Sequence, residues 1–234
     1  MATAVAARRR RDWFDNERVL APLLLSPAVI YIIALVGFPF VLAIMFAFSD
    51  VTTGNADLEW VGFRTFGRIL DDPVFLRSLW NTFIFALIAN ALVVVVANVL
   101  ARVLTADFKG KWLIRFLILL PWTTPISLAT ITWLWTLDSI FSPIDWVLRN
   151  LGLIDTNVYW LGRPVLAMGS VIAVHAWRII PLAAVIMMAG LTAIPNEIKD
   201  AAEVDGARFW RKHFEVTIPL MAPIIAVAVL FGFV

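Results

Sequence analysis

The sequence predicts an all-α membrane protein, a polytopic bundle of helices in which five membrane spans are visible. Two features of the composition carry this prediction, since 62% of the 234 residues are hydrophobic and only 15% are charged. No soluble domain of this size needs so much apolar surface. The third observation is that apolar stretches recur along the chain, each near the length of about 20 residues that crosses a bilayer as a helix. These stretches are residues 19–49, 78–101, 116–137, 164–195 and 216–234.

The chain divides into a short basic segment, residues 1–18, and one transmembrane domain, residues 19–234. The basic segment contains five arginines and is expected to lie in the cytoplasm. The first span, 19–49, contains Gly37 and Pro39. Both residues are expected to kink the helix, because proline cannot donate a backbone hydrogen bond and glycine tolerates the bend.

A polar connection, residues 50–77, leads to the second span. The sequence Thr52-Thr53-Gly54-Asn55 within it is a turn signal. Asp72-Pro73 marks the start of a helix, because Asp can cap the first turn and Pro suits its first position. The second span also contains three asparagines, which either form hydrogen bonds between helices or line a path through the bundle. They are Asn81, Asn90 and Asn98.

The third span, 116–137, contains two prolines, Pro121 and Pro125. Prolines leave backbone carbonyls without donors, and inside a membrane such carbonyls must face protein or a cavity. A simple packing kink and a functional break of the helix are both compatible with this pattern. In the polar segment that follows, 138–163, Trp146 and Trp160 are expected to anchor the chain at the membrane interface.

His175 and Arg178 are the ionisable residues that fall within the predicted spans, both in the fourth, 164–195. A charge at the bilayer centre costs about 2.5–3.5 kcal/mol on insertion scales, so Arg178 should face the bundle or a watery cavity. Three residues apart, the two side chains share one helical face. One interpretation is a polar lining or gate of a translocation path. The other is a structural ion pair, or contacts with backbone carbonyls, inside the bundle.

The distribution of basic residues predicts the orientation in the membrane. The amino-terminal segment and the segments 102–115 and 193–213 together carry thirteen Lys and Arg, whereas 50–77 and 138–163 together carry five. Basic residues favour the cytoplasmic side. The amino terminus and the 193–213 segment are therefore expected to face the cytoplasm.

The longest polar island in the second half of the chain runs from Pro195 to Pro219. Asn196 can cap a short helix there, and Glu197 suits the first turn of that helix. Asp205-Gly206 is a stop signal, because glycine readily adopts the left-handed conformation that ends helices. A second short segment, 207–214, follows, so the pattern predicts a helix, a glycine elbow and a second helix.

This spacing resembles the EAA loop of ATP-binding-cassette (ABC) importer permeases. That family has Glu-Ala-Ala, two further residues, Asp-Gly-Ala, and a Pro twelve positions after the last Ala. The matching positions are Ala201, Ala202, Asp205, Gly206, Ala207 and Pro219. Asp200 stands where the family has Glu, and His213 where an aromatic residue is usual, with Phe214 one place later.

Three other stretches resemble elements of the carbohydrate-type branch of this family. They are Trp60-Val61-Gly62-Phe63 with Phe66, the Leu120–Pro125 stretch with its two prolines, and Trp177-Arg178 with Pro181. The resemblance implies a type I ABC importer permease fold, with more membrane helix after residue 234. It also implies a location in the cytoplasmic (inner) membrane of a bacterium or archaeon.

The resemblance further implies a permease subunit for a sugar or related polyol or glycoside. Its expected partners are a second permease subunit, two copies of an ABC ATPase, an extracytoplasmic solute-binding protein and membrane lipid. The cytoplasmic loop 196–215 would couple to the ATPase, through Asp200 and the elbow at Gly206 in particular. ATP and Mg would be held by the ATPase subunits, and no cofactor by this chain. Arg178, His175 and Trp177 are candidates for the translocation path.

The sequence contains no motif that indicates other kinds of chemistry. There is no Gly-rich phosphate loop for ATP, and with two histidines and no cysteine neither a zinc site nor thiol chemistry is expected. Neither catalysis by this chain nor nucleic-acid binding is expected. Three alternatives remain open: a permease for polyamines or other polar solutes, a membrane scaffold without transport, and an intramembrane enzyme. Binding of a cytoplasmic ATPase would separate a transporter from a scaffold.

Overall fold

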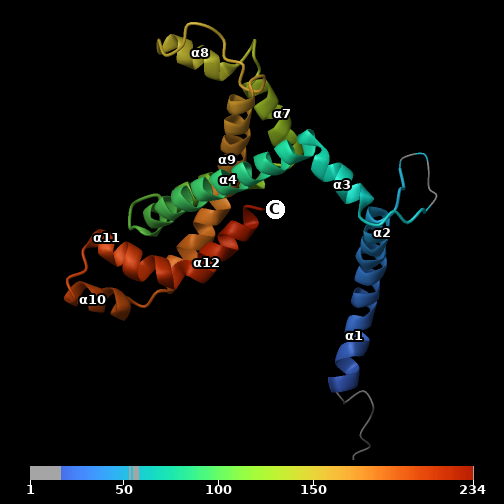
Figure 1. Ribbon diagram of the computed structural model, residues 1–234. Helices are drawn as coiled ribbons and strands as arrows, with labels where there is room; N and C mark the ends of the chain where they lie inside the picture. Colours follow the sequence, from blue (N-terminus) through green and yellow to red (C-terminus); the bar gives the residue numbers. More distant parts are fainter. Residues whose placement is uncertain (1–16, 53, 55–57, 234) are drawn as a thin grey trace, which may run out of the picture. The chain divides into compact units, whose positions relative to one another are not determined.

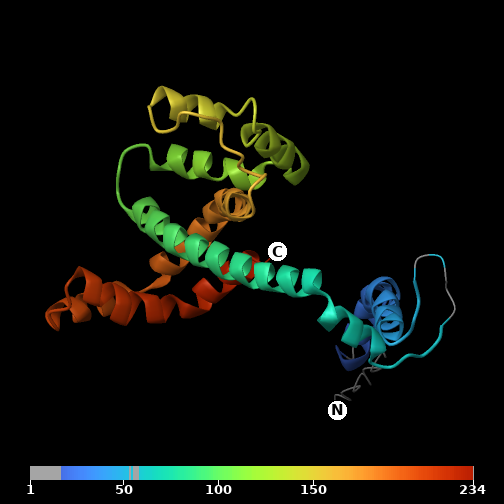
Figure 2. The ribbon, with the colours of Figure 1, turned by 45° about the horizontal axis from the view of Figure 1, so that its top comes forward.

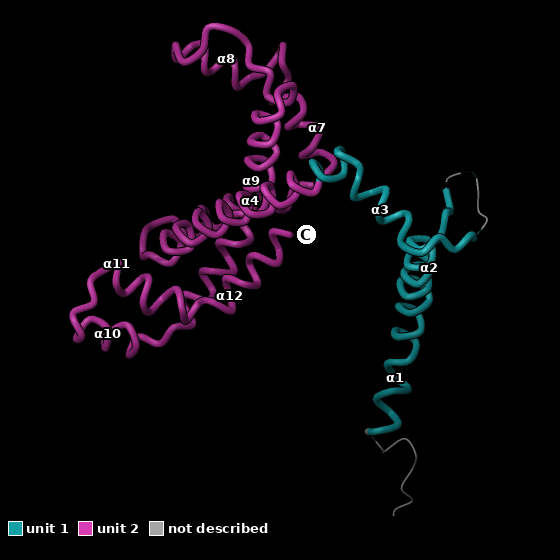
Figure 3. Tube along the Cα trace, in the orientation of Figure 1, with its two compact units in different colours: residues 1–78 teal, residues 79–234 magenta. Residues whose placement is uncertain are grey.

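The computed structural model describes residues 17–52, 54 and 58–233, and its regular elements there are all helical (Figure 1). The predicted all-α class is thereby confirmed; the isolated bridge between Ser49 and Trp60 is the β-pairing recorded within those ranges. Most of the basic segment 1–18, and Thr53 and Asn55 of the expected turn, lie outside the described residues. The chain forms two compact units, Met1–Ser78 and Leu79–Val234 (Figure 3), which are described separately.

The first unit contains one long apolar helix, Arg18–Ala47, which is long enough to cross a membrane. It consists of α1 (Glu17–Ile32), a π-helical turn (Ile33–Gly37) and α2 (Phe38–Ala47). The wider π turn ends two residues before Pro39, whose ring has no N–H and would crowd a carbonyl one turn earlier. The irregularity expected at Gly37 and Pro39 is therefore present.

The connection from α2 to the next helix is held by a carboxylate and by aromatic rings. Asp50 accepts hydrogen bonds from Arg64 Nη2 at 2.8 Å and from Arg68 Nη1 at 3.2 Å, both on α3 (Arg64–Asp71). Phe48 and Phe63 pack edge to face, with ring centroids 5.4 Å apart. These contacts join the end of α2 to α3.

Helix α4 (Pro73–Thr105) begins where the sequence predicts it. The Oδ1 atom of Asp72 accepts a hydrogen bond from the backbone N–H of Val74 at 2.8 Å, and Pro73 occupies the first helical position. The helix is longer than the apolar stretch 78–101, since it also includes the charged residues Arg77 and Arg102 at the two ends of that stretch.

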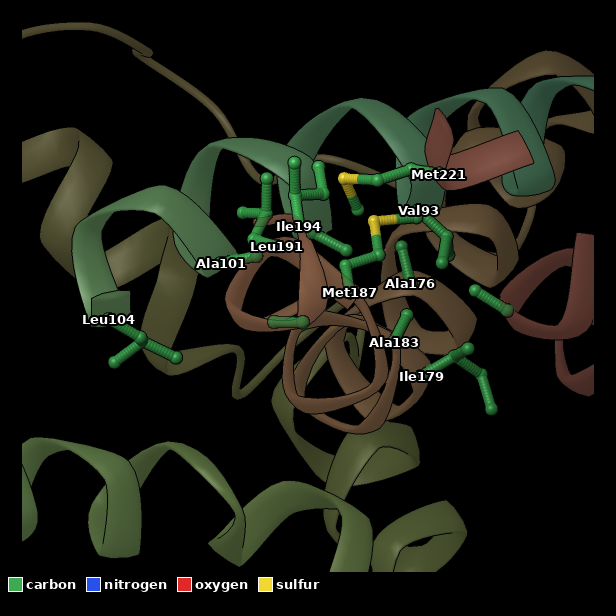
Figure 4. Packing of buried hydrophobic residues seen from close by; sticks show 13 residues of the cluster. Val93, Ala101, Leu104, Ala176, Ile179, Ala183, Met187, Leu191, Ile194 and Met221 are labelled. Atoms are coloured by element: carbon green, nitrogen blue, oxygen red, sulfur yellow. The ribbon is translucent and has the colours of Figure 1, made fainter. Parts of the chain in front are cut away.

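The second unit is built on α4, α9 (Pro164–Ala193) and α12 (Ile218–Phe231). Helix α4 crosses α9 in both views of the ribbon (Figures 1 and 2). The buried contact combines six alanines with larger apolar side chains, among them Ile179, Met187 and Met221 (Figure 4). Small side chains let helices approach closely where no water drives them together. The small residues are Ala97, Ala101, Ala176, Ala183, Ala184 and Ala228.

The third predicted span is a broken helix. It begins at α5 (Lys111–Ile118), continues through α6 (Leu120–Thr123), and then bends by 89° into α7 (Ile126–Thr136). Thr124 is extended, with ψ 129°, in keeping with the disfavour of the helical region for a residue before a proline. The sequence indicated a kink at this point, and the structure shows a right-angled break just before Pro125.

The segment 138–163 folds around one buried carboxylate. Asp145 lies on α8 (Pro143–Asn150) and is 1% exposed. It accepts hydrogen bonds from Val158 N and from Trp160 Nε1, each at 2.8 Å. Trp160 is therefore partly buried against Asp145, and its indole nitrogen is already satisfied within the protein. The sequence assigned it only to the membrane interface.

Candidate coupling loop and interior polar residues

The first helix of the predicted coupling loop is α10 (Asn196–Val204), and it ends in a glycine elbow. Gly206 has φ +75°, as expected for a left-handed helix stop. Gly206 N donates to Glu203 O at 3.0 Å and Ala207 N donates to Ala202 O at 2.9 Å. These two bonds define a Schellman motif, which satisfies the last carbonyls of the helix and fixes the direction of the chain beyond it.

The cap expected at the start of this helix is not formed by Asn196. The N-cap is Pro195, which has no side-chain donor or acceptor, and Asn196 is the first helical residue. Its Oδ1 accepts a hydrogen bond from Lys199 Nζ at 3.4 Å instead. The prediction was wrong by one position, because the fixed φ of Pro195 already brings the chain into the helix.

The second helix of the elbow continues directly into the last apolar helix. Helix α11 (Phe209–Arg211) is followed by a π-helical turn (Lys212–Thr217) and then by α12, giving one helix from Phe209 to Phe231. The sequence divided this stretch into a loop to 215 and a span from 216. As at Pro39, the π turn ends two residues before a proline, here Pro219.

The surface of the elbow combines exposed carboxylates with exposed apolar side chains. Asp200 is exposed and forms no ion pair within the described residues, whereas Ala202 is buried. Val204 is 88% exposed, and the rings of Trp210 and Phe214 stack in the open with centroids 6.0 Å apart. Such a patch is suited to contact with another protein. Four apolar residues form it: Val204, Phe209, Trp210 and Phe214.

Charged contacts hold the two sides of the elbow together. Lys212 pairs with Glu203 across it. The Lys212 ammonium, by hydrogen bond and by charge, holds the pKa of the Glu203 carboxyl below its ordinary value. Further along, Arg211 pairs with Glu215 at 2.8 Å. His213 is buried and contacts Arg102 in the last turn of α4. The elbow is therefore attached to the helix core as well as closed on itself.

The interior candidates on α9 contact different neighbours. His175 Nε2 lies 3.1 Å from the carbonyl oxygen of Gly232, and its ring packs against Phe85. Trp177 packs edge to face on Trp133 of α7, with centroids 5.4 Å apart. The expectation of one face for His175 and Arg178 holds for their spacing, but no hydrogen bond or ion pair joins them within the described residues.

Arg178 lies against an aromatic ring. Its guanidinium carbon is 5.3 Å from the ring centroid of Trp122 on α6, a cation–π geometry. Its Nε is buried without a hydrogen-bond partner. No ion pair within the described residues includes Arg178.

A cavity lies next to these interior residues. It has a volume of about 410 Å³, and Trp133, Trp160 and Ser170 are among the residues that line it. A smaller cavity of about 240 Å³ also borders Trp133. Trp133, which supports Trp177, therefore faces open space between α7 and α9.

Two contacts of this region, Arg102 with His213 and Arg178 with Trp122, could not be predicted from the sequence. Arg102 was counted only as part of a basic loop, and Trp122 only as part of a proline-rich stretch. Their partners, His213 and Arg178, are 111 and 56 residues away along the chain. Arginines also flank other predicted spans, as Arg77 and Arg115 do, so the position of Arg102 did not set it apart.

Comparison with known families identifies the class of protein. Residues 105–234, more than half of the chain, match the family described as the inner membrane component of binding-protein-dependent transport systems. The chain belongs to this family of membrane-embedded permeases. Its fold agrees: the structure of a bacterial transporter that imports the acidic polysaccharide alginate aligns with a TM-score of 0.76 at 20% identity, covering 94% of this chain and 73% of that one.

Curated relatives narrow the class to permeases of sugar ABC importers. The sulfoquinovosyl glycerol permease protein SmoG of Agrobacterium fabrum is 31% identical over 221 residues, which cover 94% of this chain and 71% of SmoG. The trehalose/maltose permease protein MalF of Thermococcus litoralis is 26% identical over 215 residues, covering 92% of this chain and 72% of that protein. The resemblance to carbohydrate-type ABC importer permeases is confirmed.

Proposed function

We propose that this chain is the permease subunit that couples a cytoplasmic ABC ATPase to the import of a sugar or a related polyol or glycoside. The observation that carries the proposal is the elbow between α10 and α11. Its Schellman motif fixes the chain direction, and its surface exposes Asp200 and several apolar side chains. Lys212 closes the elbow on itself through Glu203, and Arg102 attaches it to α4. A rigid, exposed segment of this kind can transmit a movement between subunits.

The proposed partners follow from the family. They are a second permease subunit, two ATPase subunits that hold ATP and Mg, and an extracytoplasmic protein that delivers the solute. Closure of the ATPase on ATP would move the elbow and turn the helices between inward and outward access. The solute class follows from relatives that transport sulfoquinovosyl glycerol and trehalose or maltose. A polyamine or other polar solute is the alternative.

The test is a pull-down of the ATPase by tagged permease, with uptake of candidate sugars measured in parallel. Gly206→Val places a Cβ on a residue with φ +75°, which strains the backbone by roughly 1–2 kcal/mol. No other atom lies within 4 Å of that position, so the strain acts on the elbow direction and not on the core. We expect insertion in the membrane with loss of uptake and poor retention of the ATPase.

Gly152 provides a matched control in the same chain. It ends α8 with φ +71° and with the same pair of bonds, from Gly152 N to Arg149 O and from Leu153 N to Leu148 O, both 2.9 Å. Gly152→Val should therefore cause equal strain while the ATPase remains bound. Gly206→Asn should preserve coupling, because Asn tolerates the left-handed region. Normal ATPase retention and uptake in Gly206→Val would refute the proposal.

A further inference from the structure

The last turn of α4 reaches the coupling loop through one arginine. The Nη2 atom of Arg102 contacts Nδ1 of His213, and its guanidinium carbon lies 5.3 Å above the ring centroid of Phe209. His213 is only 9% exposed, and it lies in the π turn that joins α11 to α12. Arg102 of α4 thus contacts both Phe209, at the start of α11, and His213, in the π turn that follows α11.

The chemistry of the contact determines the roles of the two groups. A guanidinium has only donors, so His213 Nδ1 must accept, and the proton of a neutral imidazole is then on Nε2. An arginine also stacks on an aromatic face while it donates in its own plane. Arg102 can therefore hold His213 and Phe209 at the same time, which lysine could do only in part.

No carboxylate competes for this arginine. Within the described residues no ion pair includes Arg102, and its Nε is buried without a partner. Its position in the last turn of α4 is favourable for a cation, because the carbonyl end of a helix carries partial negative charge. The contacts that Arg102 makes outside its own helix are thus directed at the coupling segment.

The helix that carries Arg102 is itself fixed firmly in the bundle. Val93, Ala97 and Ala101 of α4 are fully buried in the core cluster. One turn further on, Arg115 of α5 donates from Nη2 to the carbonyl oxygen of Leu104 at 2.5 Å. If the elbow moves and Arg102 moves with it, the movement is therefore transmitted to a helix that is packed in the core.

We propose that Arg102 is a positioning residue that locks the coupling segment to the C-terminal end of α4, so that the two move as one body. The inference rests on the proposed coupling function and names the residue through which the elbow acts on the bundle. It also gives His213, which stands where the family pattern has an aromatic residue, a role as the acceptor in this lock.

The test measures the distance between two spin labels in the full-length permease in lipid nanodiscs, with the ATPase that co-purifies with it. The chain contains no cysteine, so Val99→Cys on α4 and Glu197→Cys on α10 provide unique sites, and both side chains are exposed. Distances are compared in the nucleotide-free complex and after trapping with ATP and vanadate. For the otherwise unmodified chain we expect one narrow distribution that is the same in both states.

Loss of the lock should broaden this distribution and shift it on trapping. We expect this result for Arg102→Leu and for His213→Phe, and no further change in the double variant, since either substitution removes the same contact. His213→Gln keeps an acceptor and should preserve a narrow distribution. Arg102→Lys keeps a donor but not the stacking on Phe209, so its distribution should lie between those of the unmodified chain and Arg102→Leu. Lys111→Leu is the control, because that cation belongs to the same connection and pairs with Asp107 at 2.7 Å.

A purely structural role for Arg102 would reduce the amount of complex but leave the distance in the surviving molecules unchanged. Narrow, unshifted distributions in both Arg102→Leu and His213→Phe would therefore overturn the proposal, as would a shift in the unmodified pair. Failure of the ATPase to co-purify would refute the proposed function instead. In that case the nucleotide-free nanodisc measurement still tests the lock, since the contact lies within one chain.

Discussion

At the scale of single residues, Arg178 shows how a partly buried cation can be held by an aromatic ring. Its guanidinium lies over Trp122, 5.3 Å from the ring centroid. Removing one partner of a buried ion pair costs about 3–5 kcal/mol because a charge is left behind. Here Arg178→Leu leaves no orphaned anion, and the substitution removes a cation–π interaction of about 0.5–2 kcal/mol.

We therefore expect Arg178→Leu to assemble normally and to change uptake, while Arg178→Lys keeps part of the transport. The measurements are the yield of assembled complex and the uptake rate of a transported sugar. Trp122→Leu removes the same interaction and also the packing of its indole ring against the core, so it should lower stability more than Arg178→Leu. Loss of the assembled complex in Arg178→Leu would show that the residue has a structural role in the bundle.

Asp138 gives a second prediction at this scale, on pH. Backbone N–H groups of Phe141, at 2.8 Å, and Ile140, at 2.7 Å, hydrogen-bond its carboxylate and hold its pKa below the ordinary value. A depressed pKa stabilises the folded turn above the unfolded-state value of about 3.9, and this stabilisation is lost as pH falls through the folded value.

Hydrogen exchange of the amides at 140 and 141 should therefore become faster as the solution is acidified below about pH 4. The rates are to be corrected for the intrinsic pH dependence of exchange. Asp138→Asn removes the titrating group and should abolish this extra acceleration. Equal pH profiles of protection in the two proteins would contradict the role assigned to the carboxylate.

At the scale of elements, the break between α6 and α7 depends on Pro125. The proline forces Thr124 out of the helical region, and the two arms meet at 89°. Pro125→Ala removes this constraint, and the arms can approach one continuous helix. Residues 113 and 134 would then be about 32 Å apart at 1.5 Å per residue, farther than the bend allows.

Spin labels at Leu113 and Leu134, both exposed, measure that distance. We expect it to lengthen in Pro125→Ala and transport to fall. Pro121→Ala serves as the control, since Pro121 lies in the first turn of α6, where a proline costs little. An unchanged distance in Pro125→Ala would mean that tertiary packing, and not the proline, sets the angle.

The sequence could predict those features of the elements that depend on neighbouring residues alone. Local chemistry was enough at Asp72-Pro73 and at Gly206, since a cap and a left-handed glycine need no distant partner. The same local reasoning failed at Asn196, because the preceding Pro195 occupies the N-cap position. The contact of Arg102 with His213 lies beyond such reasoning, because its partners are 111 residues apart and meet only after α4 and α9 have packed.

At the scale of the whole molecule, the number of crossings decides whether the elbow can face an ATPase. Within the part of the chain that the structure describes, four helices are long and apolar enough to cross a membrane, and the bent pair Lys111–Thr123 and Ile126–Thr136 makes a fifth if it is one span. If the bent pair spans, residues 102–110 and the elbow are separated by two crossings and share a side. If it were instead a re-entrant loop, they would lie on opposite sides. The contact of Arg102 with His213 could not then form, and coupling through the elbow would be impossible.

Single cysteines at Asp107, Asp155 and Asp200 distinguish these cases, because the chain has no cysteine of its own and all three side chains are exposed. The distribution of basic residues predicts that 107 and 200 face the cytoplasm and 155 the outside. In intact cells an impermeant maleimide should therefore label only position 155, and the other two should react once the membrane is opened. Each substitution replaces an exposed carboxylate, so the fold should be unaffected. Labelling of position 200 from outside, with 155 protected, would establish the re-entrant loop and exclude the coupling role of Asp200 and Gly206.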